Sequence, residues 1–277
     1  MSTGSEGPYR TSIIPLFTRA PLRTVLRTAD GVRIEAVYEP CTAGFTPTAI
    51  VVAHGFTGSV DRPAVRRAAR VFAQRAAVVT FSFRGHGGSG GRSTVGDREV
   101  LDLVAAVEWA RSLGHTRVVT VGFSMGGSVV LRHAAMRATE SVHRGRTEAR
   151  TDAVVAVSAP ARWYYRGTAP MRRLHWVVGH PVGRLVGRYG LRTRIHPRDW
   201  DPVPVSPVEA VPLIAPTPLL IVHGDRDAYF PLDHPRMLVA AVEDGPAELW
   251  LEVGMGHAEN AADDELLGRI GRWLDGE

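Results

Sequence analysis

The sequence predicts an α/β fold: an eight-stranded, mostly parallel sheet with helices on both faces and a cap insertion after the sixth strand. Short β-branched runs alternate with helical patterns along most of the chain, as they do in βαβ units. Four of the runs are more continuously apolar than the others, which is typical of strands buried on both faces of a sheet. The 277 residues and 44% hydrophobic content suit one large domain around a single core.

The first two predicted strands, Leu22–Thr28 and Val32–Glu39, flank the turn signal Ala29-Asp30-Gly31 and therefore predict an antiparallel hairpin. The apolar runs and two later segments complete the predicted sheet: Ala49–Ala53, Ala77–Phe83, Val118–Val121, Ala153–Val157, Leu219–Val222 and Glu248–Val253. Helical patterns fill the intervals and are expected to cover both faces of the sheet: Arg62–Ala76, Asp97–Ser112, Met125–Ala138, Asp233–Val242 and Asp263–Leu274.

Residues 159–216 break the alternation and are too many for an ordinary connection within a compact domain. We interpret them as a cap inserted between two parts of one core, residues 1–158 and 217–277. Helical turns are expected at Ala169–Val178 and Val182–Tyr189, whereas the proline-rich stretch Pro197–Pro218 is expected to be irregular.

The composition excludes several classes of function. The chain has a net charge of +5 but no lysine, and both a pyridoxal-phosphate Schiff base and a Walker-type phosphate loop need a lysine amine. The chain has no arginine-rich tail, so nucleic-acid binding is not expected. Cys41, the single cysteine, cannot form an intramolecular disulfide or a cysteine-based metal site. The apolar run Ile13–Phe17 is interrupted by Pro15, so we expect neither a signal peptide nor a spanning helix. The expected location is therefore the cytoplasm.

Gly122-Phe123-Ser124-Met125-Gly126 follows a predicted strand and precedes a predicted helix, which is the context of a G-x-S-x-G nucleophile elbow. Glycines on both sides of such a serine remove side chains that would collide across the sharp turn. Ser124 is therefore the candidate nucleophile. A strand-to-helix turn rich in small residues is the structural alternative.

A serine nucleophile needs a base and an acid that orients the base. His257 follows the last predicted strand in Gly254-Met255-Gly256-His257, where glycines let the loop swing the imidazole towards Ser124. Asp225 and Asp227 both follow the preceding strand, in the chain order serine, aspartate, histidine. We favour Asp227 as the acid and expect Asp225 to bond backbone amides, as aspartates in turns do.

The negative charge that develops on the substrate oxygen requires hydrogen-bond donors, and two backbone amides are expected to provide them. One belongs to Met125, after the nucleophile and at a helix N-terminus; we assign the other to Phe56 in the loop after the third strand. His54 in the same loop is interpreted as structural, since a second base has no role in this mechanism.

Five segments in this order resemble the α/β-hydrolase superfamily, in particular its esterase, lipase and acylaminoacyl-peptidase-like branches: the His54-Gly55 loop, the turn Arg84-Gly85-His86-Gly87-Gly88-Ser89, the Ser124 elbow, Gly224–Asp227 and His257. The resemblance spans most of the chain. It implies that Asp227, three residues after Gly224, is the acid, and that the insertion caps the active site. It does not identify the substrate.

Two competing interpretations fail on their context. Gly85–Gly90 matches G-x-G-x-x-G, yet the next predicted helix begins only near Asp97 and no acid ends a strand about 20 residues later. A dinucleotide site is therefore not expected. The chain has no H-E-x-x-H motif, and His175 and His180 are spaced for different faces of a helix, so no metal site is expected either.

The predicted cap carries aromatic residues and, from Arg162 to Arg198, arginines without any acid. Trp163, Tyr164 and Arg166 are candidate substrate-binding residues. The arginines form either a solvated face or a positive surface that steers an anionic substrate or an acidic carrier protein. Association with a membrane surface is a third alternative, but we see no clean amphipathic stripe and expect no stable membrane anchoring.

The favoured function is hydrolysis of a carboxylic ester without a cofactor, through an acyl-enzyme on Ser124 with His257 as base and Asp227 as its orienting acid. Thioesters and small peptides or amides are the alternative substrates of the same triad, and a non-catalytic binding protein is the alternative of a different class. The sequence indicates a small-molecule acyl substrate. An arginine-rich cap would favour a substrate with negative charge. It predicts no oligomeric state.

Overall fold

The computed structural model describes residues 20–144 and 149–276; the Ile13–Phe17 run lies outside them. Its eight-stranded sheet has the order β1-β2-β4-β3-β5-β6-β7-β8, and only β2 runs against its neighbours. The strands are β1 (Leu22–Arg27), β2 (Arg33–Glu39), β3 (Thr48–Ala53), β4 (Ala77–Phe81), β5 (Arg117–Phe123), β6 (Val154–Val157), β7 (Leu219–Gly224) and β8 (Ala247–Glu252). The predicted mostly parallel sheet and its opening hairpin are confirmed.

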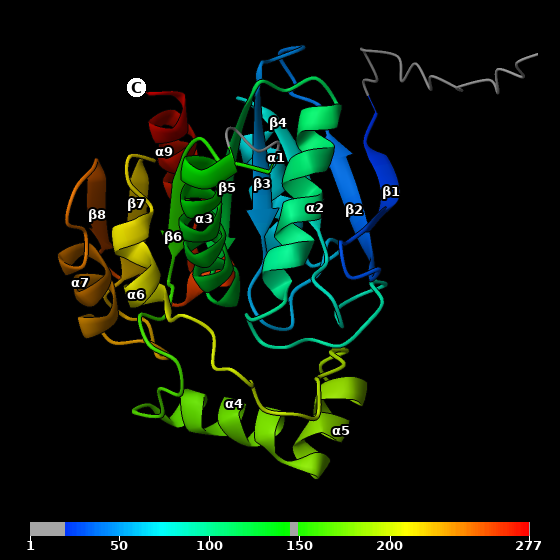
Figure 1. The fold of residues 1–277 in the computed structure, drawn as a ribbon, viewed down its shortest axis with the longest axis vertical. Coiled ribbons are helices and arrows are strands. Elements are labelled where there is room, and N and C mark those ends of the chain that lie inside the picture. Colours follow the sequence, from blue (N-terminus) through cyan, green and yellow to red (C-terminus); the bar gives the residue numbers. More distant parts are fainter. Residues whose placement is uncertain (1–19, 145–148, 277) are drawn as a thin grey trace, which may run out of the picture.

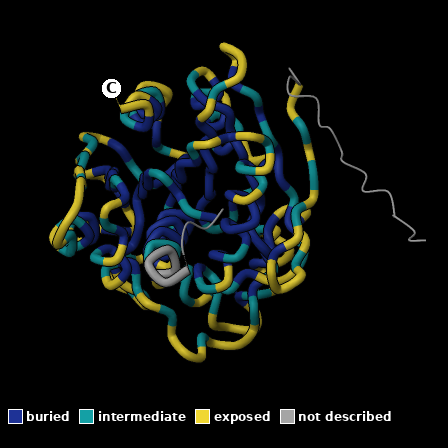
Figure 2. Tube along the Cα trace, turned by 45° about the horizontal axis from the view of Figure 1, so that its top comes forward, coloured by how far each residue is buried: buried dark blue, intermediate teal, exposed yellow. Residues whose placement is uncertain are grey.

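Helices cover both faces of the sheet, as predicted (Figure 1). On one face, α2 (Glu99–Ser112), α3 (Met125–Arg144) and α7 (Asp233–Ala240) contribute to one apolar cluster. On the other, α1 (Pro63–Phe72) and α9 (Asp264–Asp275) contribute to a second. Strands β3, β4 and β6 are buried along their whole length, and Figure 2 shows the buried backbone gathered in the centre of the molecule. This rigid centre carries the loops at the carboxyl ends of the strands.

Residues 159–216, which we call the insertion, follow β6 and lie largely beyond one end of the sheet (Figure 1). They contain α4 (Ala169–Gly179) and α5 (Pro181–Tyr189), close to the predicted bounds. Thr168 caps the start of α4, because its hydroxyl accepts the amide hydrogen of Met171.

Two short helices differ from the expectation. The stretch expected to be irregular contains α6 (Pro207–Ala210), followed by a single 3₁₀ turn, Val211–Leu213. Ser206 and Glu209 form a capping box there, a signal that the proline content obscured. A further short helix, α8 (Ala258–Ala261), begins directly after His257. Within the part of the chain that the structure describes, every helix falls short of the length and apolar character that crossing a bilayer requires.

Candidate active site

Ser124 lies on a sharp turn between β5 and α3, with a φ of 50° in the left-handed region. A side chain at either flanking glycine would collide with backbone. A Cβ on Gly122 would lie 2.2 Å from the carbonyl oxygen of Gly126, and one on Gly126 would lie 2.2 Å from that of Ala53. The two glycines therefore allow the strained serine to project from the end of the central strand.

The three residues that the sequence singled out form one chain of hydrogen bonds. The hydroxyl oxygen of Ser124 lies 2.9 Å from Nε2 of His257, and Nδ1 of the same ring lies 2.7 Å from Oδ2 of Asp227. The serine and the histidine are 133 positions apart in the sequence, so the fold alone brings them together. We call Ser124, His257 and Asp227 the candidate triad.

Asp227 is held in the position that a partner of histidine requires. Its Oδ1 accepts the amide hydrogens of Tyr229 at 2.8 Å and Phe230 at 3.1 Å, which leaves Oδ2 for His257. Burial acts to raise the pKa of Asp227, but the hydrogen bonds from His257 and the two amides outweigh it and the pKa is lowered. The carboxylate therefore stays charged and accepts the imidazole hydrogen.

Asp225 has the structural role expected of it. Its Oδ1 accepts the amide hydrogen of Gly254 at 2.6 Å and thus ties the loop before His257 to the loop after β7. A Cβ on the neighbouring Gly224 would lie 2.1 Å from the carbonyl oxygen of Met255, so the two loops approach too closely for a side chain there. The carboxylate in contact with the imidazole is that of Asp227.

Aromatic rings, which sequence reasoning missed, fix the plane of the imidazole. The ring of Tyr229 is stacked on that of His257 with centroids 4.3 Å apart, and the ring of Phe230 lies 5.6 Å away. Ala258, the residue after His257 in the chain, donates its amide hydrogen to the hydroxyl of Ser158. The stacking and the anchored loop together limit rotation of His257 away from Ser124.

The two amides assigned to the oxyanion border the same cavity as Ser124. Phe56 follows β3 and Met125 begins α3, and both residues line the cavity. Within residues 20–144 and 149–276, neither amide hydrogen has a protein acceptor. An oxygen placed between them would therefore meet donors that are not engaged elsewhere.

Glu259 supports the Phe56 loop, although no sequence signal indicated it. Its buried carboxylate accepts the amide hydrogen of Gly55 at 2.9 Å, and burial raises its pKa. Its own backbone carbonyl is held by Arg67 at 2.8 Å. Because Gly55 precedes Phe56 and Glu259 follows His257 by two positions, one carboxylate connects the candidate oxyanion loop with the loop of the candidate base.

We expect Glu259→Ala to lower kcat by about 100-fold, because a displacement of about 1 Å at the Phe56 amide suffices for such a loss. KM is expected to change little. Glu259→Gln keeps one acceptor oxygen, so its kcat should be at least about a tenth of that of the unmodified protein. Initial rates and melting temperatures of both variants check this expectation, and equal losses of kcat in correctly folded Ala and Gln variants would contradict the positioning role.

His54, which precedes Gly55 in the Phe56 loop, has both ring nitrogens in hydrogen bonds. Nε2 accepts the amide hydrogen of Phe83 at 3.0 Å, which makes Nδ1 the protonated nitrogen that faces the carbonyl of Gly55 at 2.7 Å. Burial, with a contribution from the nearby His86, lowers the pKa of His54 to about 3. The ring stays neutral and connects two loops.

A cavity of about 190 Å³ adjoins Ser124. The three insertion residues expected to bind substrate, Trp163, Tyr164 and Arg166, all line it. The indole of Trp163 donates to the carbonyl of Pro204 at 2.9 Å and packs edge-on against Trp200 at 5.0 Å between ring centroids. Core and insertion thus share one largely apolar cavity.

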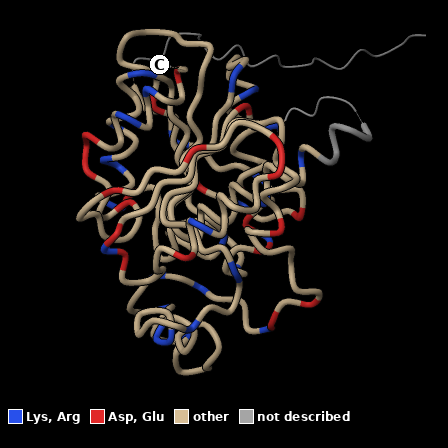
Figure 3. The backbone as a smooth tube through the Cα atoms, turned by 90° about the vertical axis from the view of Figure 1, so that its left-hand side faces the viewer, with Lys and Arg blue, Asp and Glu red and all other residues tan. Residues whose placement is uncertain are grey.

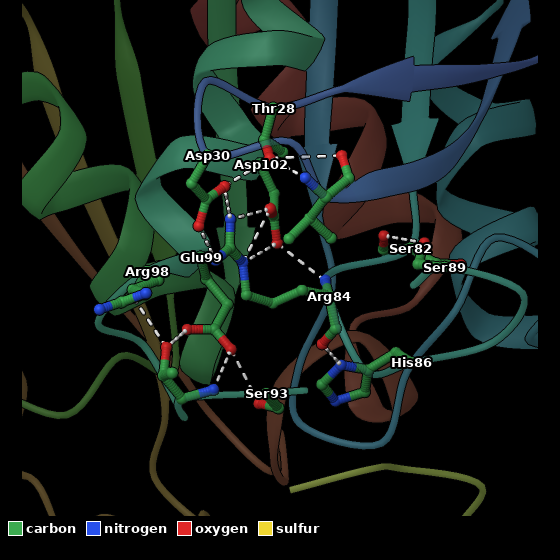
Figure 4. A network of polar contacts seen from close by, with 12 residues as sticks. Thr28, Asp30, Ser82, Arg84, His86, Ser89, Ser93, Arg98, Glu99 and Asp102 are labelled. Atoms are coloured by element: carbon green, nitrogen blue, oxygen red, sulfur yellow. Dashed lines mark hydrogen bonds and ion pairs between the residues drawn. The ribbon is translucent and has the colours of Figure 1, made fainter. Parts of the chain in front are cut away.

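A network of ion pairs and hydrogen bonds, in which Arg84, Asp102 and Glu99 are buried, includes Ser93 (Figure 4). Arg84 forms ion pairs of 2.8 Å with both Asp102 and Asp30, and it lowers the pKa of Asp30 to about 2. Glu99, from the same helix as Asp102, accepts the hydroxyl hydrogen of Ser93 at 2.8 Å. Since Ser93 lines the cavity, this network keeps the loop before α2 in place.

Glycines of the turn after β4 pack closely against other protein groups. The amide of Gly88 donates to a carboxylate oxygen of Glu35 at 2.9 Å, and a Cβ on Gly85 would lie 2.4 Å from the carbonyl oxygen of Arg194. In the described part of the chain, no cluster of three or more histidine, cysteine, aspartate or glutamate side chains is arranged to hold a metal ion.

Two curated proteins are similar to most of this chain. An uncharacterized protein of Mycobacterium tuberculosis is 27% identical over 95% of this chain and 79% of its own length. Monoacylglycerol lipase of Mycolicibacterium smegmatis is 28% identical over 82% of this chain and 86% of the lipase.

Solved structures share the fold. The esterase Pf2001 of Pyrococcus furiosus superimposes with a TM-score of 0.70 at 22% identity, over 93% of this chain and 91% of the esterase. A Xanthomonas campestris serine hydrolase described as lacking a lid superimposes with a TM-score of 0.59 at 20% identity, over 95% of both chains. The family model of the α/β-hydrolase fold matches residues 48–162, which include Phe56, Ser124 and Met125. With this match and the observed sheet, the chain has the α/β-hydrolase fold.

Proposed function

We propose that the protein is a serine hydrolase that cleaves carboxylic esters through an acyl-enzyme on Ser124. The observation that carries the proposal is the unbroken chain of hydrogen bonds from Ser124 through His257 to Asp227 beside a cavity. A serine hydroxyl becomes a nucleophile when an oriented imidazole takes its proton, and this arrangement is suited to that transfer.

The reaction begins when the oxygen of Ser124 attacks the ester carbonyl and its proton moves to Nε2 of His257. The amides of Phe56 and Met125 stabilise the oxyanion, while Asp227 stabilises the imidazolium. The proton then passes from His257 to the leaving alcohol, which departs and leaves the acyl group on Ser124. A water molecule, activated by the same imidazole, releases the acid and restores the serine.

The lining of the cavity supports an ester with an apolar acyl or alcohol part. Met171, Leu174 and Val178 of α4 and the ring of Phe230 contribute apolar walls. The similar proteins named as an esterase and a monoacylglycerol lipase support the same class of substrate. The test is a set of matched 4-nitrophenyl esters, thioesters and anilides. The ester is expected to be hydrolysed fastest, and turnover of the thioester or anilide alone would contradict the proposal.

Two arginines at the cavity suit an anionic substrate. Arg162 is paired with Asp233 at 3.2 Å, whereas among the described residues no ion pair involves Arg166 or Arg198, which also line the cavity. Arg172 donates to backbone carbonyls near Arg166, so its guanidinium is engaged. The positive charge of Arg166 and Arg198 therefore remains available to attract an anion towards the cavity.

For an anionic ester, kcat/KM is expected to fall as salt rises from about 0.01 to 0.15 M, because the screening length shrinks from about 30 to 8 Å. A neutral ester of the same size should hardly respond. Arg166→Gln combined with Arg198→Gln should remove the difference in salt response, and kcat/KM for the neutral ester should change far less than kcat/KM for the anionic ester at low salt. Equal salt responses of the two esters with the unmodified protein would contradict steering and make the arginines a solvated surface.

A further inference from the structure

Helix α5 turns an apolar face towards solvent. Val182, Leu185, Val186 and Tyr189 follow the helical spacing i, i+3, i+4 and i+7, so they share one side of the helix. Tyr189 is 74% exposed and the other three are 45–55% exposed. We call these four residues the outer apolar face. The expectation that the insertion lacks an amphipathic stripe is therefore wrong for α5.

The outer apolar face is not used to attach α5 to the protein. The helix packs instead through two buried glycines on another side. A Cβ on Gly183 would lie 2.4 Å from the carbonyl oxygen of Trp176 in α4, and one on Gly187 would lie 2.9 Å from the side chain of Ile195. Backbone contact through small residues thus holds α5 in place, and the large apolar side chains remain free to meet another surface.

Positive charge lies beside this face. The segment from Arg162 to Arg198 contains nine arginines and no acid, and Figure 3 shows this part of the insertion with basic positions. Arg188 and Arg192 are exposed, and the guanidinium of Arg188 lies 5.4 Å from the ring centroid of Tyr189. A surface that covers the apolar residues must therefore also accept the two arginines beside them.

A second copy of the chain fits this requirement poorly. In a two-fold contact the same face meets itself, so arginines would approach arginines with no acid of the segment to pair with them. A lipid surface with anionic headgroups meets both needs, because its acyl region takes up apolar side chains and its phosphates and carboxylates bind arginine.

We propose that the outer apolar face and the arginines beside it dock reversibly on an anionic lipid surface, with α5 lying in the plane of the headgroups. Tyrosine is well suited to this depth because its ring is apolar and its hydroxyl is polar. α4, against which α5 packs, lines the cavity with Met171, Leu174 and Val178. Docking therefore brings the cavity wall close to the lipid, independently of which bond the protein cleaves.

The test is co-flotation of the full chain with vesicles of phosphatidylcholine, alone or mixed with phosphatidylserine, at low and high salt. The mixed vesicles are expected to bind at least about tenfold more protein, and salt should weaken this binding. Leu185→Ser with Tyr189→Ser should reduce it about tenfold or more. Arg188→Gln with Arg192→Gln should reduce it by about fivefold for each arginine removed.

Val25→Ser with Val253→Ser is the matched control, since both valines are at least half exposed and lie outside the insertion. This variant should bind like the unmodified chain. Melting temperatures establish that every variant is folded, so the test needs no turnover. Failure to prefer anionic vesicles, or full binding by the Leu185/Tyr189 variant, would overturn the proposal. If the unmodified chain were a dimer and only the Leu185/Tyr189 variant were a monomer, the face would bind a second copy, which would also overturn the proposal.

Discussion

Replacing Ser124 by alanine is expected to lower kcat for an ester by about six orders of magnitude. A loss of this size is typical when the nucleophile of a catalytic triad is removed. Without the hydroxyl, no acyl-enzyme can form, and only the cavity and the two free amides remain to assist attack by water. The substitution removes a single hydrogen bond, that to His257, so its effect on the free energy of unfolding should be only about 1 kcal/mol. Steady-state rates and thermal unfolding measure both effects.

Thr80, in β4 and outside the cavity lining, is the control. Its hydroxyl is buried without a hydrogen-bond partner among the described residues, so Thr80→Val removes an unsatisfied hydroxyl group. This variant should keep kcat within a few-fold and lose no stability. If purified Ser124→Ala retained more than a few per cent of the turnover, the covalent mechanism would be refuted.

Asp227→Asn is expected to lower kcat by about four orders of magnitude while the fold persists. The amides of Tyr229 and Phe230 will hold the carbonyl oxygen of the new side chain where Oδ1 lies now. Its NH₂ group then faces Nδ1 of His257, which must become an acceptor. The ring proton moves to Nε2 and points at Ser124, so the imidazole can no longer take the serine proton.

Asp225→Asn distinguishes this effect from a general disturbance of the loop. The oxygen of Asp225 bonds Gly254 and touches neither His257 nor Ser124, so its amide analogue should affect mainly the melting temperature. Rates of the two variants at saturating substrate, with thermal unfolding of each, separate the roles. A large loss of kcat in Asp225→Asn with little loss in Asp227→Asn would transfer the orienting role to Asp225.

The order of elements could be predicted from the sequence because the central strands are nearly continuous apolar runs. Ala77–Phe81 is buried at every position, so its pattern is independent of which helix covers which face. The candidate triad could be predicted because glycines mark the turns that carry Ser124 and His257. These signals are local, and each reflects a backbone constraint that the fold imposes at that point.

Residues that act through distant contacts could not be predicted. Glu259 and Gly55 are 204 positions apart, and an acid two residues after a histidine has no signature of its own. The exposed face of α5 was hidden for a different reason. Its apolar spacing resembles that of a helix packed on a core, and only the close approach at Gly183 and Gly187 reveals that another side is buried.

Covalent labelling with a fluorophosphonate probe tests the central claim most directly, because such probes react with a serine only when a neighbouring base activates it. After proteolysis, mass spectrometry is expected to find the phosphonyl adduct on Ser124, with labelling strongly reduced in Asp227→Asn and absent in Ser124→Ala. An unlabelled protein, or an adduct that persists at another residue in Ser124→Ala while Ser124 stays unmodified in the native chain, would contradict the proposed mechanism.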